Sequence, residues 1–593
     1  MPDQTLALDA DAIRRKYAEE RDKRFRAEQN AQWAELDERF AHLSEDPYVE
    51  PGFTRDPIVE DIDALVIGGG FGGMIAAVEL QKRGIENIRI VEKAGDFGGT
   101  WYWNRYPGAQ CDTESYIYLP YLEETGYIPT EKYVFAPEML EHSQRIATHF
   151  GLYDKALFQT QVLEMAWDEA SRRWNVATNR DDVLRARHVI YCSGPLNRVK
   201  LPGVLGLKTF KGKVFHTSRW DYDYTGGSTD TPMTRLHDKR VAVIGTGATA
   251  IQCVPRLAED AQHLYVVQRT PSVVGERGNC PTDMDWAASL EAGWQRERST
   301  NFESHVIGQS NEPDLVSDGW TVLNRSIRPQ PSSEPRIPED LAREGELRDF
   351  AAGEKIRARI DATVTDPATA EALKPWYRIY CKRPTFNDEY YPAFNLPNVT
   401  LLDTQGAGLE RLTETGIVAC GTEYEVDCII FATGFETGSE YTKRSEFEVR
   451  GVGGRTLTEH FRKGPLTLHG FYAHGFPNFF ILGNSQNAFT ASFTHMLLDQ
   501  GQHICDMIAM MQERGLTRLE PEEQAVEDWQ HVVRESVEPR KLFLASCTPG
   551  YYNGYGEVDA GLFTSSYSGG FIAFNAIMDA WRSKEDFAGL ELS

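Results

Sequence analysis

The chain has 593 residues, with 62 lysines and arginines against 88 aspartates and glutamates, so its formal net charge is −26. At about 150 residues per domain, this length allows roughly four structural units. The 41% hydrophobic and 25% charged residues are typical of a globular protein and exclude general disorder. No stretch approaches the roughly 18 consecutive apolar residues of a membrane-spanning helix, and so acidic a chain is poorly suited to binding nucleic-acid phosphates.

The cysteines and the first residues indicate a compartment. The nine cysteines are odd in number, scattered, and include no pair spaced CxxC. This pattern favours reduced thiols and argues against a disulfide framework or a zinc cluster. The N-terminal segment becomes charged where a signal peptide has its apolar core. We therefore expect a soluble cytoplasmic protein without a metal site, whose partners are small molecules rather than membranes or nucleic acids.

The first 60 residues are predicted to form a helical arm and a linker. Ile13 and Tyr17 lie four residues apart, and Trp33, Leu36 and Phe40 follow the i, i+3, i+7 spacing of one helical face. These spacings predict two amphipathic helices, and a proline-bounded extended segment follows them. Such an arm could shape a substrate site or an oligomer contact, or it could simply cover the main body.

The pattern of a dinucleotide-binding unit begins after the linker. Residues 61–67 form a short apolar run typical of a buried parallel strand. The run leads directly into a glycine-rich turn with Gly68, Gly70 and Gly73. A helical stretch and a second apolar run follow, and the second run ends on Glu92. This order of strand, glycine turn, helix, strand and acid predicts a βαβ unit that binds a dinucleotide.

The same unit occurs a second time. The apolar run 240–244 precedes the turn GTGATA, in which Ala250 takes the place of the third glycine. Arg269 stands 24 residues after the first glycine of this turn, just as the acid of the first unit stands 24 residues after its own first glycine. An acid there suits ribose hydroxyls, whereas a cation suits a 2′-phosphate. We therefore predict that the first unit binds FAD and the second binds NADPH.

Two further strands and a helical stretch complete the predicted α/β fold. Residues 189–194 and 428–434 are apolar runs that end in small residues, and the second lies far beyond the NADPH unit. This predicts two Rossmann-like domains, with the NADPH domain inserted into a discontinuous FAD domain and carrying a helical insertion at about 283–375. The predicted divisions are the arm and linker at 1–60, the first part of the FAD domain at 61–200, the NADPH domain at 201–405, and the second part of the FAD domain with the C-terminal segment at 406–593.

A twelve-residue fingerprint follows the first unit. Residues 210–221 read FKGKVFHTSRWD. They match the pattern FxGxxxHxxxW[P/D] at every specified position, which are Phe210, Gly212, His216, Trp220 and Asp221. In this the chain resembles the class B flavoprotein monooxygenases, and specifically the Baeyer–Villiger monooxygenases.

A second fingerprint of the same family supports the resemblance. The pattern [A/G]GxWxxxx[F/Y]P[G/M]xxxD is matched from Gly98 through Trp101 and Tyr106 to Asp112. The resemblance extends over about residues 61–570. The stretches CKRPTFNDEY and CTPGYYN are similar to the branch that acts on large cyclic ketones.

The resemblance implies a specific reaction. NADPH reduces FAD, O2 adds to give a flavin C4a-peroxide, and the peroxide attacks a ketone, which rearranges to an ester or lactone. Oxygenation of nitrogen or sulfur is the alternative, although Trp220 and Asp221 argue against it because such relatives usually lack this ending. A disulfide reductase would require two cysteines one helical turn apart beside the flavin, and the chain has no such pair. A non-catalytic scaffold is disfavoured by the intact turns and basic residues.

The resemblance also assigns roles within the site. Arg383 matches the active-site arginine, and Asp112 is the carboxylate that would orient it. Lys382 would join Arg269 and Thr270 on the 2′-phosphate. The positions predicted to contact a cofactor are Gly68, Gly70, Gly73, Glu92, Gly99, Thr100, Trp101, Tyr102, Trp103, Gln110, Cys111, Asp112, Tyr118, Val162, Gly245, Thr246, Gly247, Ala248, Thr249, Ala250, Arg269, Thr270, Lys382, Arg383 and Met496.

Two assignments are less direct. His216 is predicted to act as a hinge or hydrogen-bonding residue rather than as a general base, because the family places it away from the flavin. Near the C-terminus the family often has a tryptophan against the nicotinamide ribose, but this chain reads CTPGYY there. The sequence leaves open whether Tyr551, Tyr552 or neither takes over that contact.

Overall fold

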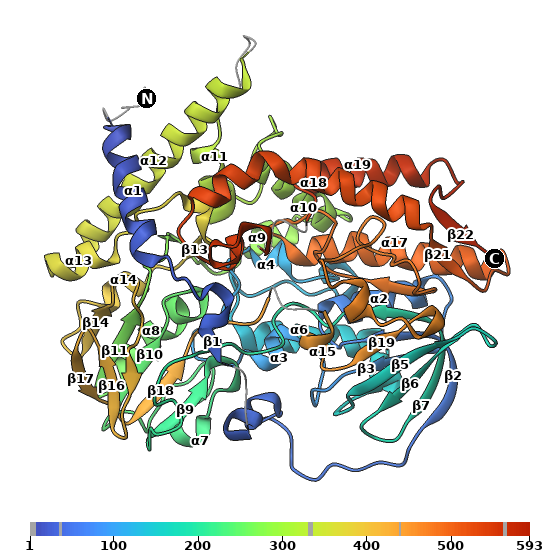
Figure 1. Cartoon of the computed structure of the whole chain (residues 1–593), viewed down its shortest axis with the longest axis horizontal. Coiled ribbons are helices and arrows are strands. Elements are labelled where there is room, and N and C mark those ends of the chain that lie inside the picture. The colour runs from blue at the N-terminus through green and yellow to red at the C-terminus, as the bar shows by residue number, and fades with distance from the viewer. Residues whose placement is uncertain (1–7, 35–37, 330–335, 438–440, 561–565) are drawn as a thin grey trace.

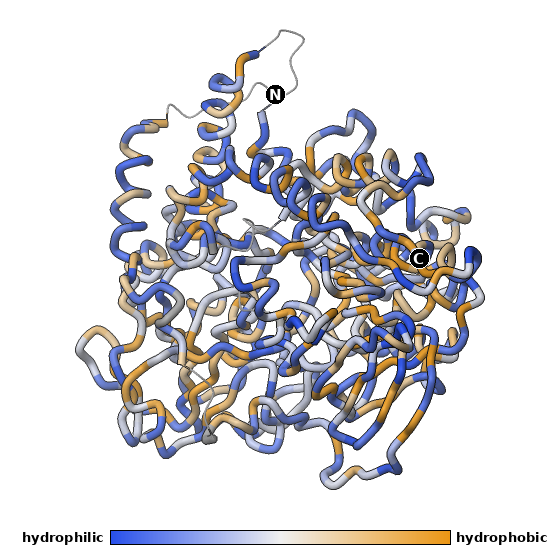
Figure 2. Tube along the Cα trace, turned by 45° about the vertical axis from the view of Figure 1, so that its right-hand side comes forward, coloured by the Kyte–Doolittle hydropathy of each residue, from blue (hydrophilic) through white to orange (hydrophobic). Residues whose placement is uncertain are grey.

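Two sheets lie side by side beneath a layer of helices (Figure 1). The computed structural model describes residues 8–34, 38–329, 336–437, 441–560 and 566–593. Hydrophobic segments follow the strands of both sheets, whereas the outer helices carry many hydrophilic residues (Figure 2). None of the helices in these ranges combines the length and the apolar character needed to cross a membrane.

The first sheet contains the first glycine turn, between β2 (Val59–Ile67) and α2 (Phe71–Lys82). Residues 64–66 in the second half of β2 are fully buried, as expected for a parallel strand covered on both faces. The strand order is β19-β5-β6-β7-β2-β3-β4, and β20 also pairs with β7. The other strands of this sheet are β3 (Ile88–Val91), β4 (Ala156–Leu157), β5 (Val162–Asp168), β6 (Arg173–Thr178), β7 (Val183–Tyr191), β19 (Glu448–Arg450) and β20 (Phe479–Ile481).

The second sheet contains the second glycine turn, between β10 (Arg240–Ile244) and α8 (Ala248–Asp260). Its order is β14-β11-β10-β18-β9, and all its strands are parallel. The other strands are β9 (Lys213–His216), β11 (His263–Gln268), β14 (Val399–Asp403) and β18 (Cys428–Phe431). A small antiparallel sheet of β15 (Arg411–Leu412), β16 (Gly416–Ala419) and β17 (Thr422–Glu425) adjoins it.

The position of β18 corrects the predicted division of the chain. The sequence prediction placed residues 428–434 in the second part of the FAD domain, but β18 pairs with β10 and β9. The second sheet therefore extends past the predicted boundary at residue 405. A short strand buried on both faces carries no sign of which sheet it joins, and this explains the error. The discontinuity itself is confirmed, because β19 and β20 return to the first sheet.

Helices fill the stretch predicted as an insertion and cover both sheets. They are α9 (Met284–Ala288), α10 (Trp294–Val306), α11 (Gly319–Ile327), α12 (Pro338–Thr363) and α13 (Pro367–Leu373). The same layer contains α17 (Phe493–Glu513), α18 (Glu523–Ser546) and α19 (Phe571–Arg582). The remaining elements are α3 (Thr100–Trp103), α4 (Ser115–Tyr118), α5 (Leu122–Thr125), α6 (Ala136–His149), α7 (Tyr222–Thr225), α14 (Tyr390–Ala393), α15 (Tyr441–Ser445), α16 (Leu457–His460), β12 (Val274–Gly275) and β13 (Thr385–Phe386).

The N-terminal arm forms one helix rather than two. Helix α1 (Ala10–Arg24) buries Ile13 and Tyr17 against Phe350 of α12. The residues predicted as a second helix instead form the short strand β1 (Trp33–Ala34) and a 3₁₀ turn, and Leu36 lies outside the described residues. Strand β1 pairs with β8 (Leu201–Pro202), so the arm is tied to the body at both of its described ends.

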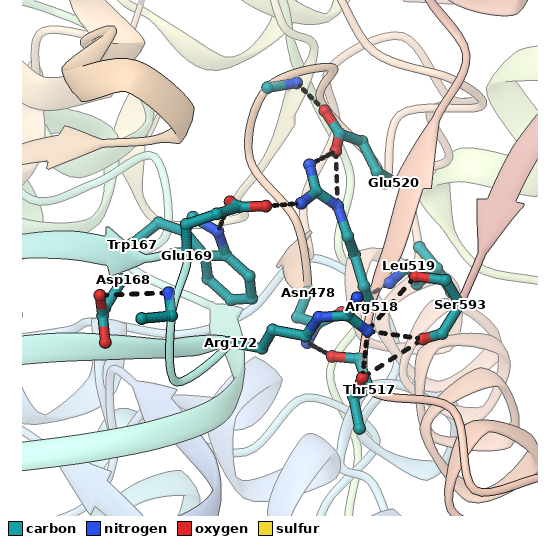
Figure 3. Close-up of polar contacts among 12 residues, drawn as sticks. Trp167, Asp168, Glu169, Arg172, Asn478, Thr517, Arg518, Leu519, Glu520 and Ser593 are labelled. Carbon is teal, nitrogen blue, oxygen red and sulfur yellow. Dashed lines mark hydrogen bonds and ion pairs between the residues drawn. The ribbon is translucent and has the colours of Figure 1, made fainter.

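The C-terminus closes onto the first sheet. Strands β21 (Leu519–Pro521) and β22 (Leu590–Leu592) pair there. Figure 3 shows that Arg518 bonds to Glu520 at 2.6 Å and also to Glu169 beyond β5. Arg172 of the same turn donates to Thr517 at 2.5 Å. These contacts fix the terminal ribbon to the β5–β6 hairpin.

One disulfide departs from the expectation of reduced thiols. Cys381 and Cys547 are bonded, with Cα atoms 5.0 Å apart, and the other seven cysteines are unpaired. The two partners are 166 residues apart, so only the tertiary fold brings them together. The bond joins the segment before β13 to the end of α18.

Candidate active site

A large cleft opens where the first glycine turn meets the second fingerprint. It contains about 1400 Å³ of empty space, part of it open to solvent. Rossmann folds bind dinucleotides at this edge, outside the carboxyl ends of parallel strands. The predicted cofactor residues that line it are Gly68, Gly70, Glu92, Gly99, Thr100, Trp101, Trp103, Tyr118 and Val162.

The first glycine turn has no room for side chains. A Cβ on Gly68 would lie 2.6 Å from the Cys192 carbonyl oxygen, and the φ of Gly68 is 111°. A Cβ on Gly73 would lie 1.8 Å from the Gly68 carbonyl oxygen. Gly99 approaches from the second fingerprint, and its Cβ would lie 2.6 Å from the Cα of Gly70. This tight backbone cradle fits the pyrophosphate of a dinucleotide such as FAD.

Glu92 faces the turn from the end of β3. Its Oε2 accepts a hydrogen bond from Gly69 N at 2.5 Å, and its Oε1 accepts one from Ala94 N at 2.7 Å. Burial raises the pKa of this carboxyl, although the two backbone bonds and Lys93 act in the opposite direction. An acceptor at this position suits the hydroxyls of a ribose.

Several predicted cofactor residues lie outside the cleft lining. The Tyr102 hydroxyl donates to Asp46 Oδ2 at 2.7 Å and so points toward the linker. Gln110 accepts a hydrogen bond from Arg277, and Cys111 is half-buried beside it. The structure brings none of these three predicted side chains into the lining.

Helix α17 reaches the cleft through residues that the sequence did not single out. Met496 is fully buried in the core. Phe493, Thr494 and Leu497 line the cleft instead. The structure thus places Met496 on the right helix but away from the cleft.

Strand ends supply a large group of the lining residues that sequence reasoning missed. Lys93 follows β3, residues 191–197 span the end of β7 and the loop after it, and residues 482–484 follow β20. All of them stand at carboxyl ends of parallel strands, where open α/β sheets bind ligands. The small-residue end of the run 189–194 was the one available signal for this group.

The second glycine turn is more open than the first. Gly245 has φ of 114°, and its Cβ would lie 2.6 Å from the Ala432 carbonyl oxygen. Gly247 is exposed, and a Cβ on it would meet nothing within 4 Å. The Thr246 hydroxyl donates to the Thr270 carbonyl at 2.8 Å, which ties the turn to the end of β11.

At the start of α8, exposure falls from a solvent-exposed residue to a fully buried one within three positions. Ala248 is exposed, Thr249 is half-buried and Ala250 is fully buried. The free amides at this helix start are available to a phosphate group. Ala250 takes the packing position that Gly73 holds in the first unit.

Arg269 and Lys382, the basic residues predicted to read a 2′-phosphate, lie near enough to each other to interact electrostatically. Burial and repulsion from Arg269 and Arg24 lower the pKa of Lys382 to about 7. Burial also lowers the pKa of Arg269, as do Arg26 and Arg24. Cations held together against their own repulsion create a site for an anion.

Arg383 and Asp112 form a two-pronged ion pair. Arg383 Nη1 lies 2.5 Å from Asp112 Oδ2, and Nη2 lies 2.8 Å from Oδ1. Burial would raise the pKa of Asp112, but Arg383 and Arg277 outweigh it and lower the pKa. Burial would lower the pKa of Arg383, but Asp112 raises it well above its usual value. The guanidinium is therefore a fixed cation in a partly desolvated position.

The loop of the second fingerprint, which carries Asp112, is hydrogen-bonded to α8 of the second unit. The Tyr106 hydroxyl donates to Gln252 Oε1 at 2.7 Å, and Gln252 Nε2 donates to the Gln110 carbonyl at 2.7 Å. Gly108 fits closely against the same helix, because its Cβ would lie 2.4 Å from the Gln252 carbonyl oxygen. The loop that carries Asp112 is thereby docked on α8 of the second unit.

Aromatic side chains cover Arg383 from two segments. Its Cζ lies 5.1 Å from the centre of the Trp320 ring, which belongs to α11 of the insertion. Tyr551 and Tyr552, whose rings are 4.7 Å apart, both lie close enough to act on the charge of Arg383. The sequence left open which tyrosine, if either, contacts the nicotinamide ribose, and in the structure both tyrosines interact electrostatically with Arg383.

His216 is buried at the end of β9. Its Nδ1 lies 2.8 Å from Ser218 Oγ, and its ring centre lies 5.5 Å from that of Phe435. Burial and the nearby Arg219 lower its pKa to about 3, so the imidazole is neutral near pH 7. These contacts support a positioning role.

The rest of the first fingerprint forms a packed turn. Gly212 leaves room for Phe210, since a Cβ would lie 2.4 Å from the Phe210 ring. Trp220 is buried, and Asp221 caps α7 by accepting from Tyr224 N at 2.9 Å. Phe210 and Gly212 precede β9, whereas Trp220 and Asp221 lie in the segment that follows it.

An enzyme with two dinucleotide sites passes electrons from one cofactor to the other. The two turns and their sheets therefore define a flavoprotein oxidoreductase.

Comparison with known proteins narrows this class. Residues 66–125 match the family model of an NAD(P)-binding Rossmann-like domain. A Baeyer–Villiger monooxygenase from Dietzia sp. strain D5 is 48% identical, over 100% of this chain and 97% of its own length. The polycyclic ketone monooxygenase of the thermophilic fungus Thermothelomyces thermophila matches with a TM-score of 0.90 and 39% identity, covering 98% of this chain and 99% of that chain. A steroid monooxygenase bound to NADP matches with a TM-score of 0.73 and 30% identity, covering 90% and 99%. The chain belongs to the Baeyer–Villiger monooxygenase family.

Proposed function

We propose that this protein converts bulky cyclic or polycyclic ketones to esters or lactones, using FAD, NADPH and O2, with Arg383 as the central catalytic residue. The observation that carries this proposal is the two-pronged pairing of Arg383 with Asp112 at the junction of the two dinucleotide units. Two similar structures are those of a polycyclic ketone monooxygenase and a steroid monooxygenase, and these names support a large substrate.

The residues present fit both cofactors. The tight turn at Gly68 and Gly73, with Glu92 beside it, would hold FAD in the first cleft. The open turn at Gly245, with Arg269 and Lys382 beside it, would hold NADPH. When bound, NADPH would supply the hydride that reduces FAD, and the reduced FAD would activate O2.

Arg383 acts through its permanent charge. Transfer of oxygen to a ketone requires negative charge on the attacking oxygen and then on the former carbonyl oxygen. A guanidinium does not lose its proton in a protein, so Arg383 can stabilise both without taking part in proton transfer. Asp112 accepts hydrogen bonds from both terminal nitrogens, Nη1 and Nη2, and so fixes the orientation of the guanidinium plane.

The surrounding side chains keep the charge effective. Trp320 lies over Arg383, and Tyr551 and Tyr552 lie near enough to act on its charge. A preorganised cation in a site with little water stabilises developing charge far better than the same cation in bulk water. Because Trp320 belongs to the helical insertion, we propose that the insertion also borders the ketone and sets its size.

The proposed setting is the cytoplasm, with the ketone and O2 as small-molecule partners. Seven of the nine cysteines are unpaired, as is usual in a reducing compartment. The buried Cys381–Cys547 bond is the exception that this proposal must accommodate.

The test is a panel of linear, small cyclic, macrocyclic and steroid ketones. We expect FAD-loaded protein to consume NADPH with the macrocyclic and steroid members and to yield products that gain one oxygen atom, measured by mass spectrometry. Products found only with amines or sulfides would contradict the proposed reaction. Conversion of only the small ketones would contradict the proposed substrate size.

A further inference from the structure

Part of the N-terminal arm lies against the proposed 2′-phosphate site. The Arg269 guanidinium donates to Gln32 Oε1, and its Cζ lies 5.7 Å from the centre of the Trp33 ring. Gln32 and Trp33 stand more than 230 residues before Arg269 in the sequence. Figure 1 shows the arm running from α1 down to β1 beside the second sheet. The arm therefore touches the residue that distinguishes the second unit from the first.

The arm also brings further positive charge to this place. A Cβ on Gly408 would lie 3.8 Å from Arg26 Nη1 and 3.9 Å from Arg269 Cδ, so the two arginines flank the same point of the backbone. Arg24 is buried and acts on both Arg269 and Lys382. Four basic side chains from three distant segments thus converge on one region.

Within the described residues, Arg24 is the only one of these four basic side chains that pairs with a carboxylate. Glu20 pairs with Arg24 at 2.5 Å and is shared with Lys16 and Lys23. Within the described ranges, no carboxylate forms an ion pair with Arg26, Arg269 or Lys382. Gathering like charges without a counterion is unfavourable unless an anion completes the group.

Trp33 adds an unused donor to the same region. Its indole ring lies between Lys200, whose Nζ is 4.7 Å from the ring centre, and Arg269. The edge of Tyr555 packs on it, with ring centres 5.5 Å apart. Its Nε1 is buried and has no hydrogen-bond partner in the part of the chain that the structure describes. Strand β1 holds Trp33 here through its pairing with β8.

We propose that the N-terminal arm is a wall of the NADPH site, in which Arg26 binds the 2′-phosphate together with Arg269 and Lys382. Gln32 and Trp33 position Arg269 for this contact. The inference rests on the proposed use of NADPH and adds a segment that precedes both dinucleotide units in the chain. It gives the arm a function beyond covering α12.

The experiment compares 2′,5′-ADP with ADP as probes of the phosphate. Both are titrated calorimetrically into FAD-loaded protein at one fixed salt concentration, with no turnover. In Arg26→Ala we expect 2′,5′-ADP to bind at least about tenfold more weakly, because a charged hydrogen bond is lost, while the affinity for ADP stays unchanged. Arg26→Lys should recover part of the loss, since it keeps the charge.

Arg21→Ala is the matched control. Arg21 lies in the last turn of α1 and pairs with its neighbour Asp22 at 2.8 Å, so its loss should leave both affinities unchanged. FAD content and thermal stability identify any variant that has lost its fold.

Three outcomes would overturn the inference. Wild-type affinity for 2′,5′-ADP in Arg26→Ala would show that the arm does not bind the phosphate, and would leave the proposed function intact. Equal weakening of ADP and 2′,5′-ADP would show that the arm only supports the fold. A wild-type protein that does not prefer 2′,5′-ADP to ADP would refute the use of NADPH and the inference with it.

Discussion

The two dinucleotide units share one plan but differ in how closely the protein surrounds the turn. In the first unit the turn is packed against the second fingerprint, and Glu92 is engaged by backbone amides of its own segment. In the second, the turn at Gly247 is open, and the recognition residue Arg269 is held by side chains from the arm. The first arrangement suits a cofactor that stays bound, and the second suits one that enters and leaves.

The two units differ most clearly at the third glycine position of the motif, which is Gly73 in the first unit and Ala250 in the second. Substitution at this position should have the largest effect on cofactor binding. A Cβ on Gly73 would lie 1.8 Å from the Gly68 carbonyl oxygen, a contact that only backbone movement could relieve, whereas the second unit already has Ala250 there. We expect Gly73→Ala to abolish FAD binding or folding. Ala250→Gly should cost about 1 kcal/mol of stability at most and leave NADPH use intact.

Flavin absorbance of the purified variants and their thermal unfolding check this contrast. Full FAD occupancy in Gly73→Ala would show that the first turn is not as tightly packed as described. A loss of NADPH binding in Ala250→Gly would show that the second turn is equally demanding.

The difference between the units could be predicted from the sequence only in part. The glycine turns, Glu92 and Arg269 were predictable because each follows a local pattern of strand, turn and helix. The insertion helices were predictable from their composition. The sheet joined by β18, the Cys381–Cys547 bond and the contact of Gln32 with Arg269 were not predictable, because each depends on segments that meet only in the tertiary fold. Local sequence patterns do not predict contacts between segments that are far apart in the chain.

Arg383 lies between the two units. Its substitution tests whether the coupling of NADPH oxidation to ester formation depends on its positive charge. The flavin turn does not involve Arg383, so FAD should remain bound in Arg383→Ala. Loss of a charged stabiliser in a site with little water usually costs about 3–4 kcal/mol, or roughly 100- to 1000-fold in rate. We therefore expect ester formation to fall by that factor while NADPH oxidation continues and hydrogen peroxide is released.

Paired assays of NADPH consumed and ester formed, with hydrogen peroxide measured separately, give the coupling. Arg383→Lys is the matched variant, since it retains a cation but not the paired contact with Asp112. Wild-type coupling in Arg383→Ala would remove the central residue of the proposed mechanism.

Substitution of Arg269 tests directly whether the second unit distinguishes NADPH from NADH through the 2′-phosphate. A lost charged contact to a phosphate usually costs about 1.5–3 kcal/mol, or roughly 10- to 150-fold. Arg269→Ala should raise the KM for NADPH by that factor and leave the KM for NADH nearly unchanged. Arg256→Ala is a suitable control, because Arg256 lies on α8 but pairs with Glu389 at 2.8 Å. Equal weakening of both nucleotides in Arg269→Ala would show that the residue does not read the phosphate.

Lys382 adds an effect that appears only as the pH changes and is confined to the second unit. Burial together with Arg269 and Arg24 lowers its pKa to about 7, so the free enzyme loses this positive charge as the pH rises through 7. Arg269 and Arg24 are the charged groups that act on Lys382, and a guanidinium does not lose its proton in a protein. A phosphate with a second pKa of about 6 remains a dianion above pH 7 and favours protonated Lys382. Binding of 2′,5′-ADP must then take up a proton, and its Kd should rise between pH 7 and 9 by up to about tenfold per pH unit.

Two controls check this prediction. The Kd of ADP should not change with pH, and Lys382→Arg should remove the pH dependence for 2′,5′-ADP, because a guanidinium does not titrate in this range. A slope that persists in Lys382→Arg would assign the titration to another group.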